Sequence, residues 1–179
     1  MIEIRAATPA DAAAVAQVRR ASWFAAYTGI IDEADIERAT GPAAADRIRE
    51  QMRARSWSST LVAAGPAVVG FASFGPERDM LAGWPAPVTA AGADGQVAEV
   101  YAIYVHPDWW STGAGRLLMG EALSRLREGS YREVVLWVLE RNDRARRFYE
   151  LAGFTADGAV NILHNLGGVP EVRYRRDLS

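Results

Sequence analysis

The residues best suited to do chemistry in this sequence form a loop between an apolar stretch and a predicted helix. The segment from Tyr104 to Arg116 reads Tyr-Val-His-Pro-Asp-Trp-Trp-Ser-Thr-Gly-Ala-Gly-Arg, so Gly113 and Gly115 lie where the helix should begin. Unpaired backbone N–H groups and the helix dipole favour an anion at the first turn of a helix. Glycine lacks the Cβ that would keep a phosphate away from the backbone. The segment therefore predicts a site for a phosphate group.

Two known phosphate-binding motifs can be compared with this loop. A P-loop requires Lys and then Ser or Thr after its last glycine, and Arg116 and Leu117 exclude it here. A dinucleotide-binding loop requires a third glycine where this chain has Leu118, although Glu140 after the next predicted strand could replace the ribose-binding acid. From these residues alone, a dinucleotide-binding loop and an ordinary strand-to-helix turn both remain as alternatives.

A second segment downstream extends the pattern. After the apolar stretch Leu136 to Leu139, the sequence places in order Asn142, Ala145, Phe148-Tyr149 and Gly153-Phe154. Together with Val105-His106-Pro107 and the two glycines, this order resembles motifs A and B of the GNAT superfamily of N-acetyltransferases, and the likeness spans nearly the whole chain. Trp110 departs from the family pattern, which has Gln or Arg there, and should weaken the site rather than abolish it.

The resemblance implies a catalytic acid and a catalytic base for acetyl transfer from acetyl-CoA to an amine. Tyr149 lies where the family has a tyrosine that protonates the departing thiolate; the alternative is a residue that only packs beside Phe148. Glu99 lies where the histone acetyltransferase branch has its catalytic glutamate. It would accept the proton of the amine directly or through water, and the alternative is a solvated charge at a sheet edge.

The resemblance also implies binding residues along the strand end, the glycine loop and the motif B helix. Those expected to bind the cofactor acetyl-CoA are Ile103, Tyr104, Val105, Trp110, Ser111, Thr112, Gly113, Ala114, Gly115, Arg116, Asn142, Arg144 and Phe148. Asn142 is also a helix N-cap, and the basic run Arg141, Arg144, Arg146 and Arg147 could meet the adenosine 3′-phosphate or form a solvated face. The acceptor pocket is expected to be bordered by Trp23, Tyr27, Tyr101 and His164.

The elements that must position these residues follow from hydrophobic periodicity and turn residues. Strands are predicted over residues 2–6, 61–64, 67–74, 97–105, 134–139, 160–166 and 169–175. Helices are predicted from the Thr8 cap to Tyr27, from 32 to 55 with a break near 40–42, over 114–128, and from Asn142 to Gly153. Residues 83–95 predict a surface loop. The inner face of the 114–128 helix is predicted to consist of Leu117, Leu118, Ala122, Leu123 and Leu126.

This order predicts a single α/β domain over residues 1–179, with a mixed sheet of six to seven strands flanked by helices. The resemblance adds that the sheet is mostly antiparallel and that its two central parallel strands splay apart where acetyl-CoA binds. It also adds that the amine attacks directly in a ternary complex.

Composition excludes several classes of function. A net charge of −2 argues against a nucleic-acid partner, and the absence of cysteine excludes disulfides, thiolate metal sites and a cysteine nucleophile. Two histidines are too few for a His-rich metal centre, so no metal is expected. The N-terminus does not read as a signal peptide and no stretch is long enough to span a bilayer, which predicts a cytoplasmic protein without a membrane partner.

The acceptor stays unidentified at this level. A small-molecule or peptide amine is expected as the partner, and a homodimer is compatible with the sequence. A hypothesis from another class is a module of the same fold that binds acyl-CoA without catalysis and acts as a sensor, motivated by the departure at Trp110.

Overall fold

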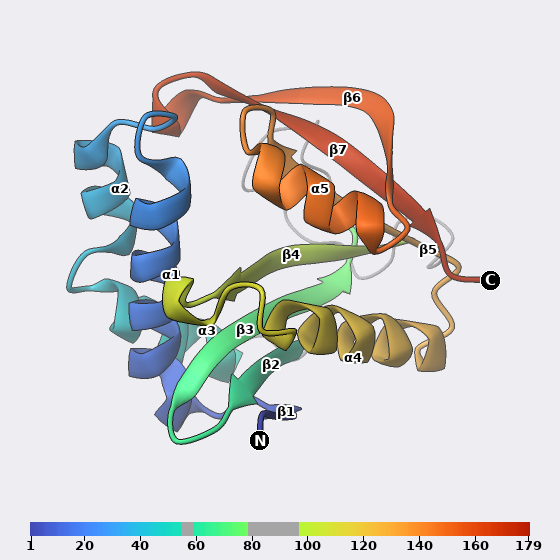
Figure 1. The fold of residues 1–179 in the computed structure, drawn as a ribbon, viewed down its shortest axis with the longest axis horizontal. Coiled ribbons are helices and arrows are strands. Elements are labelled where there is room, and N and C mark those ends of the chain that lie inside the picture. Colours follow the sequence, from blue (N-terminus) through green and yellow to red (C-terminus); the bar gives the residue numbers. More distant parts are fainter. Residues whose placement is uncertain (55–58, 79–96) are drawn as a thin grey trace.

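The computed structural model describes residues 1–54, 59–78 and 97–179, and these form one seven-stranded sheet with helices on both faces (Figure 1). The strands are β1 (Glu3–Ala6), β2 (Ser59–Ala64), β3 (Val68–Pro76), β4 (Val97–Val105), β5 (Glu133–Leu139), β6 (Thr155–Leu163) and β7 (Val169–Asp177). The helices are α1 (Ala12–Tyr27), α2 (Glu33–Thr40), α3 (Ala44–Ala54), α4 (Ala114–Glu128) and α5 (Asp143–Leu151). The strand order is β1-β2-β3-β4-β5-β7-β6, and only β4 and β5 pair in parallel. The predicted fold class is therefore confirmed.

The two parallel strands stay together for only part of their length. Their register joins Val97–Val100 to Glu133–Leu136, whereas β4 continues to Val105 and β5 to Leu139. Beyond Val100 the two strands diverge, and the sheet is open between them. The predicted splay is present, and it leaves one edge of β4 without a neighbouring strand.

A β-bulge lies at the start of this opening. On β3, Ser73 pairs with Ala102 and Phe74 with Val100, so Tyr101 is an extra residue on β4. A bulge bends its strand and shifts the alternation of side chains by one residue. Consequently the side chain of Tyr104 lies on the face of the sheet that α1 covers. Without the bulge, side chains alternating along β4 from Glu99 would place Tyr104 on the opposite face.

The helices cover the two faces of the sheet with separate apolar clusters. On one face α4 contributes Leu118, Met119 and Leu123 to the main core, which also holds Tyr149 of α5 and Tyr174 of β7. On the other face α1 and α3 pack against Val62 and Phe71. A third cluster around Trp23, Ile31, Ile36, Leu139 and Leu166 joins α1 and α2 to the end of β5. The opening between β4 and β5 therefore connects two differently built faces.

Most predicted elements are present, and two details were wrong. The last hairpin begins earlier than predicted: β6 spans Thr155–Leu163, and His164–Leu166 form a 3-10 turn rather than strand. Leu117 is 46% exposed, whereas Met119 is buried, because the packed positions of α4 follow the row 114, 118, 122 and 126 and its neighbours at 119 and 123. The loop predicted over 83–95 lies outside the described residues. Within the described helices, none is both long and apolar enough to cross a membrane.

Candidate active site

A cavity of about 710 Å³ occupies the opening between β4 and β5. It is lined by every residue predicted to bind the cofactor except Ala114, which is fully buried in α4. Tyr149, Glu99, Trp23, Tyr27 and Tyr101 line it as well. His164, which the sequence predicted at the acceptor pocket, is exposed and does not line the cavity; its neighbours Leu163 and Leu166 do.

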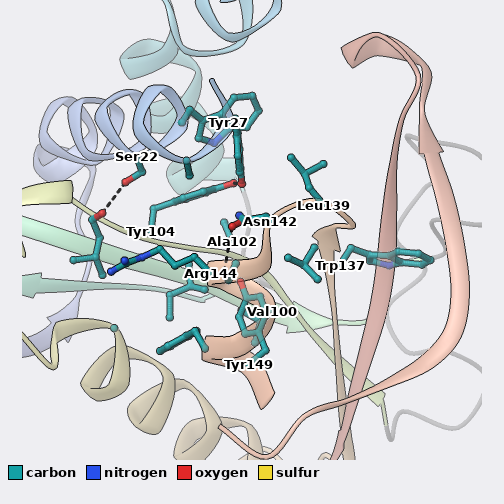
Figure 2. A pocket seen from close by; sticks show the side chains of 18 of the residues that line it. Ser22, Tyr27, Val100, Ala102, Tyr104, Trp137, Leu139, Asn142, Arg144 and Tyr149 are labelled. Carbon is teal, nitrogen blue, oxygen red and sulfur yellow. Dashed lines mark hydrogen bonds between the residues drawn. The ribbon is translucent and has the colours of Figure 1, made fainter. Parts of the chain in front are cut away.

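The cavity has two sides of different chemistry. We call the first the loop side; it consists of residues 110–113, 115 and 116 with Arg144, Phe148 and Tyr149. We call the second the aromatic side; it consists of Trp23, Tyr27, Tyr104, Trp137, Leu139, Glu99 and Glu171. Figure 2 shows Tyr27 and Tyr104 meeting beside α1, with Tyr149 directed from α5 toward β4 at Val100 and Ala102.

The loop side presents unpaired N–H groups at the start of α4. Leu117 is the first residue of this helix whose N–H donates to a backbone carbonyl, that of Gly113 at 3.0 Å. The N–H groups of residues 111–116 have no acceptor among the described residues. Positive φ values at Ser111 (63°) and Gly113 (96°) shape the turn, and Thr112 Oγ1 donates to the Trp109 carbonyl at 2.8 Å. This arrangement fits a phosphate or pyrophosphate group.

Trp110 fastens this loop to the end of β4. Its Nε1 donates to the Val105 carbonyl at 2.7 Å, and Ser22 Oγ donates to the same oxygen at 2.8 Å. The guanidinium carbon of Arg144 lies 4.3 Å from the centre of a Trp110 ring, and Arg144 Nη2 donates to Ser111 Oγ at 3.4 Å. Trp110 thus holds a cation beside the free N–H groups.

The basic run on and before α5 divides between two environments. Arg144 and Arg147 line the cavity, as does the Asn142 cap, whose Oδ1 accepts from the Ala145 N–H at 3.2 Å. Arg146 points elsewhere: it donates to the Tyr174 hydroxyl at 3.1 Å and to the Glu140 carbonyl at 3.0 Å. Arg141 is exposed and does not line the cavity. The helical rotation of 100° per residue separates residues that are adjacent in the sequence.

Tyr149 sits where the two sides meet. Its ring packs against Phe148, Phe154 and Tyr174 at centroid distances of 5.4, 6.1 and 6.5 Å. Burial, with a smaller contribution from Tyr104, raises the pKa of the Tyr149 phenol well above its usual value. Its hydroxyl has no hydrogen-bond partner among the described residues, although it lines the cavity. The group is therefore a protonated donor without an internal acceptor.

Glu99 is 1% exposed and is held by an arginine that sequence reasoning missed. Glu99 Oε2 accepts from the backbone N–H and the Nε of Arg78 at 2.9 and 3.1 Å, while Oε1 forms an ion pair with Nη2. Arg78 also lies 4.3 Å over the Tyr101 ring, whose hydroxyl donates to the Pro76 carbonyl at 2.5 Å. No local signal could have found Arg78, because the pairing of Gly75 with Glu99 across two strands brings it here.

The aromatic side is organised by a pair of hydroxyl groups. Tyr27 and Tyr104 are hydrogen-bonded through their hydroxyl oxygens at 3.2 Å, and burial together with Tyr104 raises the pKa of Tyr27. Trp23 packs edge-to-face on Tyr27 at 5.2 Å and carries Arg19 4.8 Å over its ring. Trp137, Leu139 and Glu171 complete this side and were missed from the sequence, because the register of β5 and β7 alone places them here.

Within residues 1–54, 59–78 and 97–179, no group of three His, Asp or Glu side chains could hold an ion.

Comparisons with known proteins bear on the family and the fold. The model of the acetyltransferase (GNAT) family matches residues 20–154. A "Probable N-acetyltransferase" of Mycobacterium tuberculosis is 28% identical over 97% of this chain and 92% of its own length. The PaiA N-acetyltransferase from Thermoplasma acidophilum, solved in complex with coenzyme A, is 20% identical and has a TM-score of 0.74, covering 97% of this chain and 98% of its own. A putative acetyltransferase from Salmonella typhimurium, solved with its cofactor acetyl-CoA, is 21% identical and has a TM-score of 0.72. The match covers 100% of this chain and 95% of that one.

Proposed function

Because the chain belongs to the acetyltransferase (GNAT) family, we propose that it transfers the acetyl group of acetyl-CoA to a primary amine by direct attack, without a covalent enzyme intermediate. The observation that carries this proposal is the position of Tyr149 in the cavity wall: the residue is largely buried, and its hydroxyl has no hydrogen-bond partner among the described residues. This arrangement supports proton donation at the point where two substrates would meet.

The loop side fits acetyl-CoA. The N–H groups of residues 111–116 and Arg144 can hold the pyrophosphate, and the unpaired edge of β4 beyond Val100 can bond the amide groups of the pantetheine arm as an added strand would. When bound, acetyl-CoA supplies a thioester whose acetyl carbon the amine nitrogen attacks as the carbon–sulfur bond breaks.

Tyr149 and Glu99 are proposed to move the two protons. Tyr149 protonates the departing thiolate, and its raised pKa keeps the phenol protonated at neutral pH. Glu99 takes the proton of the amine directly or through water. A carboxylate has about four acceptor sites and Arg78 fills three of them, so the proton would reach Glu99 at the remaining site on Oε1.

The proposal is tested by incubating the purified chain with acetyl-CoA and a panel of primary amines while the release of free CoA thiol is measured. Calorimetry with acetyl-CoA in the same buffer reports binding independently of turnover. We expect binding, and turnover that depends on at least one amine. Tight binding with no turnover on any acceptor would favour the non-catalytic sensor, and the absence of binding would contradict both functions.

A further inference from the structure

A second buried carboxylate lies in the cavity and has no part in the proton transfers above. Glu171 of β7 is 7% exposed and lines the same cavity as Glu99. Its Oε1 accepts a single hydrogen bond, from Asn161 Nδ2 at 2.8 Å. Its Oε2 has no hydrogen-bond partner, and no salt bridge reaches Glu171, within the described part of the chain. A carboxylate this deeply buried ordinarily has a cationic partner.

The sheet register places Glu171 on the aromatic side. Glu171 pairs with Leu139, and Glu99 pairs with Val135 on the same strand β5. Residues 135 and 139 are four apart, so their side chains and those of their partners share one face of the sheet. That face is opposite to Val138, which packs in the core with Tyr149. Glu171 therefore faces an acceptor that approaches from the side away from the glycine loop.

Among the described residues, no cation forms an ion pair with Glu171. Burial raises the pKa of Glu171, Glu99 raises it further, and Asn161 and the more distant Arg78 lower it. Arg78 is committed to Glu99. Arg173, two residues along on the same face, is paired with Asp157 at 2.7 Å and with Glu77 at 3.4 Å. Thus Glu171 and the Glu99–Arg78 pair together carry one uncompensated negative charge when Glu171 is ionised.

The walls beside this charge are apolar and aromatic. They are formed by Trp23, Tyr27, Leu139, Leu163 and Leu166. A ligand that fits both features carries one ammonium group on an apolar or aromatic body. We propose that Glu171 binds the ammonium group of the acceptor, and that the acceptor is accordingly an arylalkyl or alkyl primary amine; this rests on the proposed function. Glu99 then remains available to take the proton, while Glu171 binds and orients the substrate.

The inference is tested with Glu171→Gln, which keeps an oxygen for Asn161 and removes only the charge. The probes are 2-phenylethylamine, hexylamine, the unreactive trimethyl(2-phenylethyl)ammonium ion and the neutral 2-phenylethanol. We expect the variant to raise KM for both amines and the Kd of the trimethylammonium ion by at least about tenfold, with the Kd of acetyl-CoA unchanged. The parent should bind the trimethylammonium ion more tightly than the neutral alcohol. The matched control is Glu140→Gln, because Glu140 is exposed and does not line the cavity; it should leave all of these values unchanged.

A pH series adds a readout that a packing role would not change. Below its raised pKa Glu171 is neutral, so KM for the amines should rise in the parent as the pH falls through that range, and this rise should be absent in Glu171→Gln. Equal affinity of the parent and Glu171→Gln for the trimethylammonium ion would overturn the inference. So would a failure of the parent to bind that ion while it acetylates a different amine, a result that leaves the proposed function intact.

Discussion

The loop side and the aromatic side of the cavity differ in which atoms they offer to a ligand. The loop side offers mainly backbone: the free N–H groups of residues 111–116 and the unpaired edge of β4. The aromatic side offers side chains contributed by α1, β4, β5 and β7, among them Tyr27, Glu99, Trp137 and Glu171. Tyr149 packs in the main core and lines the same cavity.

The difference has a consequence for recognition. Backbone groups are the same in every residue, so a site built from them can keep one ligand while its side chains change. Side chains differ in charge and shape, so the aromatic side can be adapted to a particular acceptor by a few substitutions. We therefore expect changes on the loop side to alter acetyl-CoA affinity and changes on the aromatic side to alter acceptor use.

The largest effect is expected from Tyr149, where the two sides meet. Tyr149→Phe keeps the ring and its three aromatic neighbours but removes the proton donor. General acid catalysis is typically worth roughly 10²–10⁴-fold, and a thiolate is already a fair leaving group, so we expect kcat to fall by about 10- to 1000-fold. KM for acetyl-CoA should change little. Steady-state kinetics under conditions where chemistry limits the rate provide the measurement, and an unchanged kcat would make Tyr149 a packing residue.

Glu99 tests whether the aromatic side takes part in chemistry as well as in binding. Glu99→Gln removes the proposed base, so we expect the rate to fall by about 10- to 100-fold at low pH, where the amine is mostly protonated. Raising the pH should recover part of the loss, because free amine then forms without assistance. A pH–rate profile with the shape of the parent's would show that Glu99 is not the base. Thermal unfolding of the variant must accompany the kinetics, because Arg78 loses its charged partner.

A substitution at Gly115 tests how much the backbone of the loop side contributes to acetyl-CoA affinity. A Cβ at Gly115 would meet Phe148 and Val105 at 3.5 to 3.6 Å, which is ordinary contact, so Gly115→Ala should fold normally. Phe148 and Val105 both line the cavity, so the added methyl group would lie at the cavity wall beside the backbone that is proposed to approach the pyrophosphate. We expect the Kd of acetyl-CoA to rise by about tenfold, or 1.4 kcal/mol, by calorimetry. Gly113 is the poorer test, since its φ of 96° would strain any side chain there. Unchanged affinity in folded Gly115→Ala would remove this loop from the binding site.

The smallest effect is expected from Tyr27, on the aromatic side alone. Tyr27→Phe removes one hydrogen bond, that between its hydroxyl and the Tyr104 hydroxyl, which is typically worth about 0.5–1.5 kcal/mol. We expect KM for the acceptor to rise by about two- to tenfold while the Kd of acetyl-CoA stays the same. An equal loss of acetyl-CoA affinity would show that the two sides are not independent.

The sequence by itself determined the contiguous parts of this protein. β4 over Val97–Val105 and α4 over Ala114–Glu128 coincide with their predicted ranges, because the apolar periodicity and the stop at Gly129 are local signals. The loop with Gly113 and Gly115 was recognisable for the same reason: the N–H groups proposed to bind the pyrophosphate belong to the backbone of one short segment. The order of elements also sufficed for the fold class.

The tertiary structure alone decided which side chains share the aromatic side. The bulge at Tyr101 places Tyr104 on the same face of the sheet as Glu99. The alternation of residues in the sequence does not predict this bulge. Pairing of β3 with β4 brings Arg78 to Glu99, and pairing of β5 with β7 brings Glu171 to the same cavity, whereas His164 turns outward on its 3-10 turn. The physical reason is that a side chain's partners depend on register and burial between segments far apart in the chain, while a backbone site needs only the conformation of its own segment.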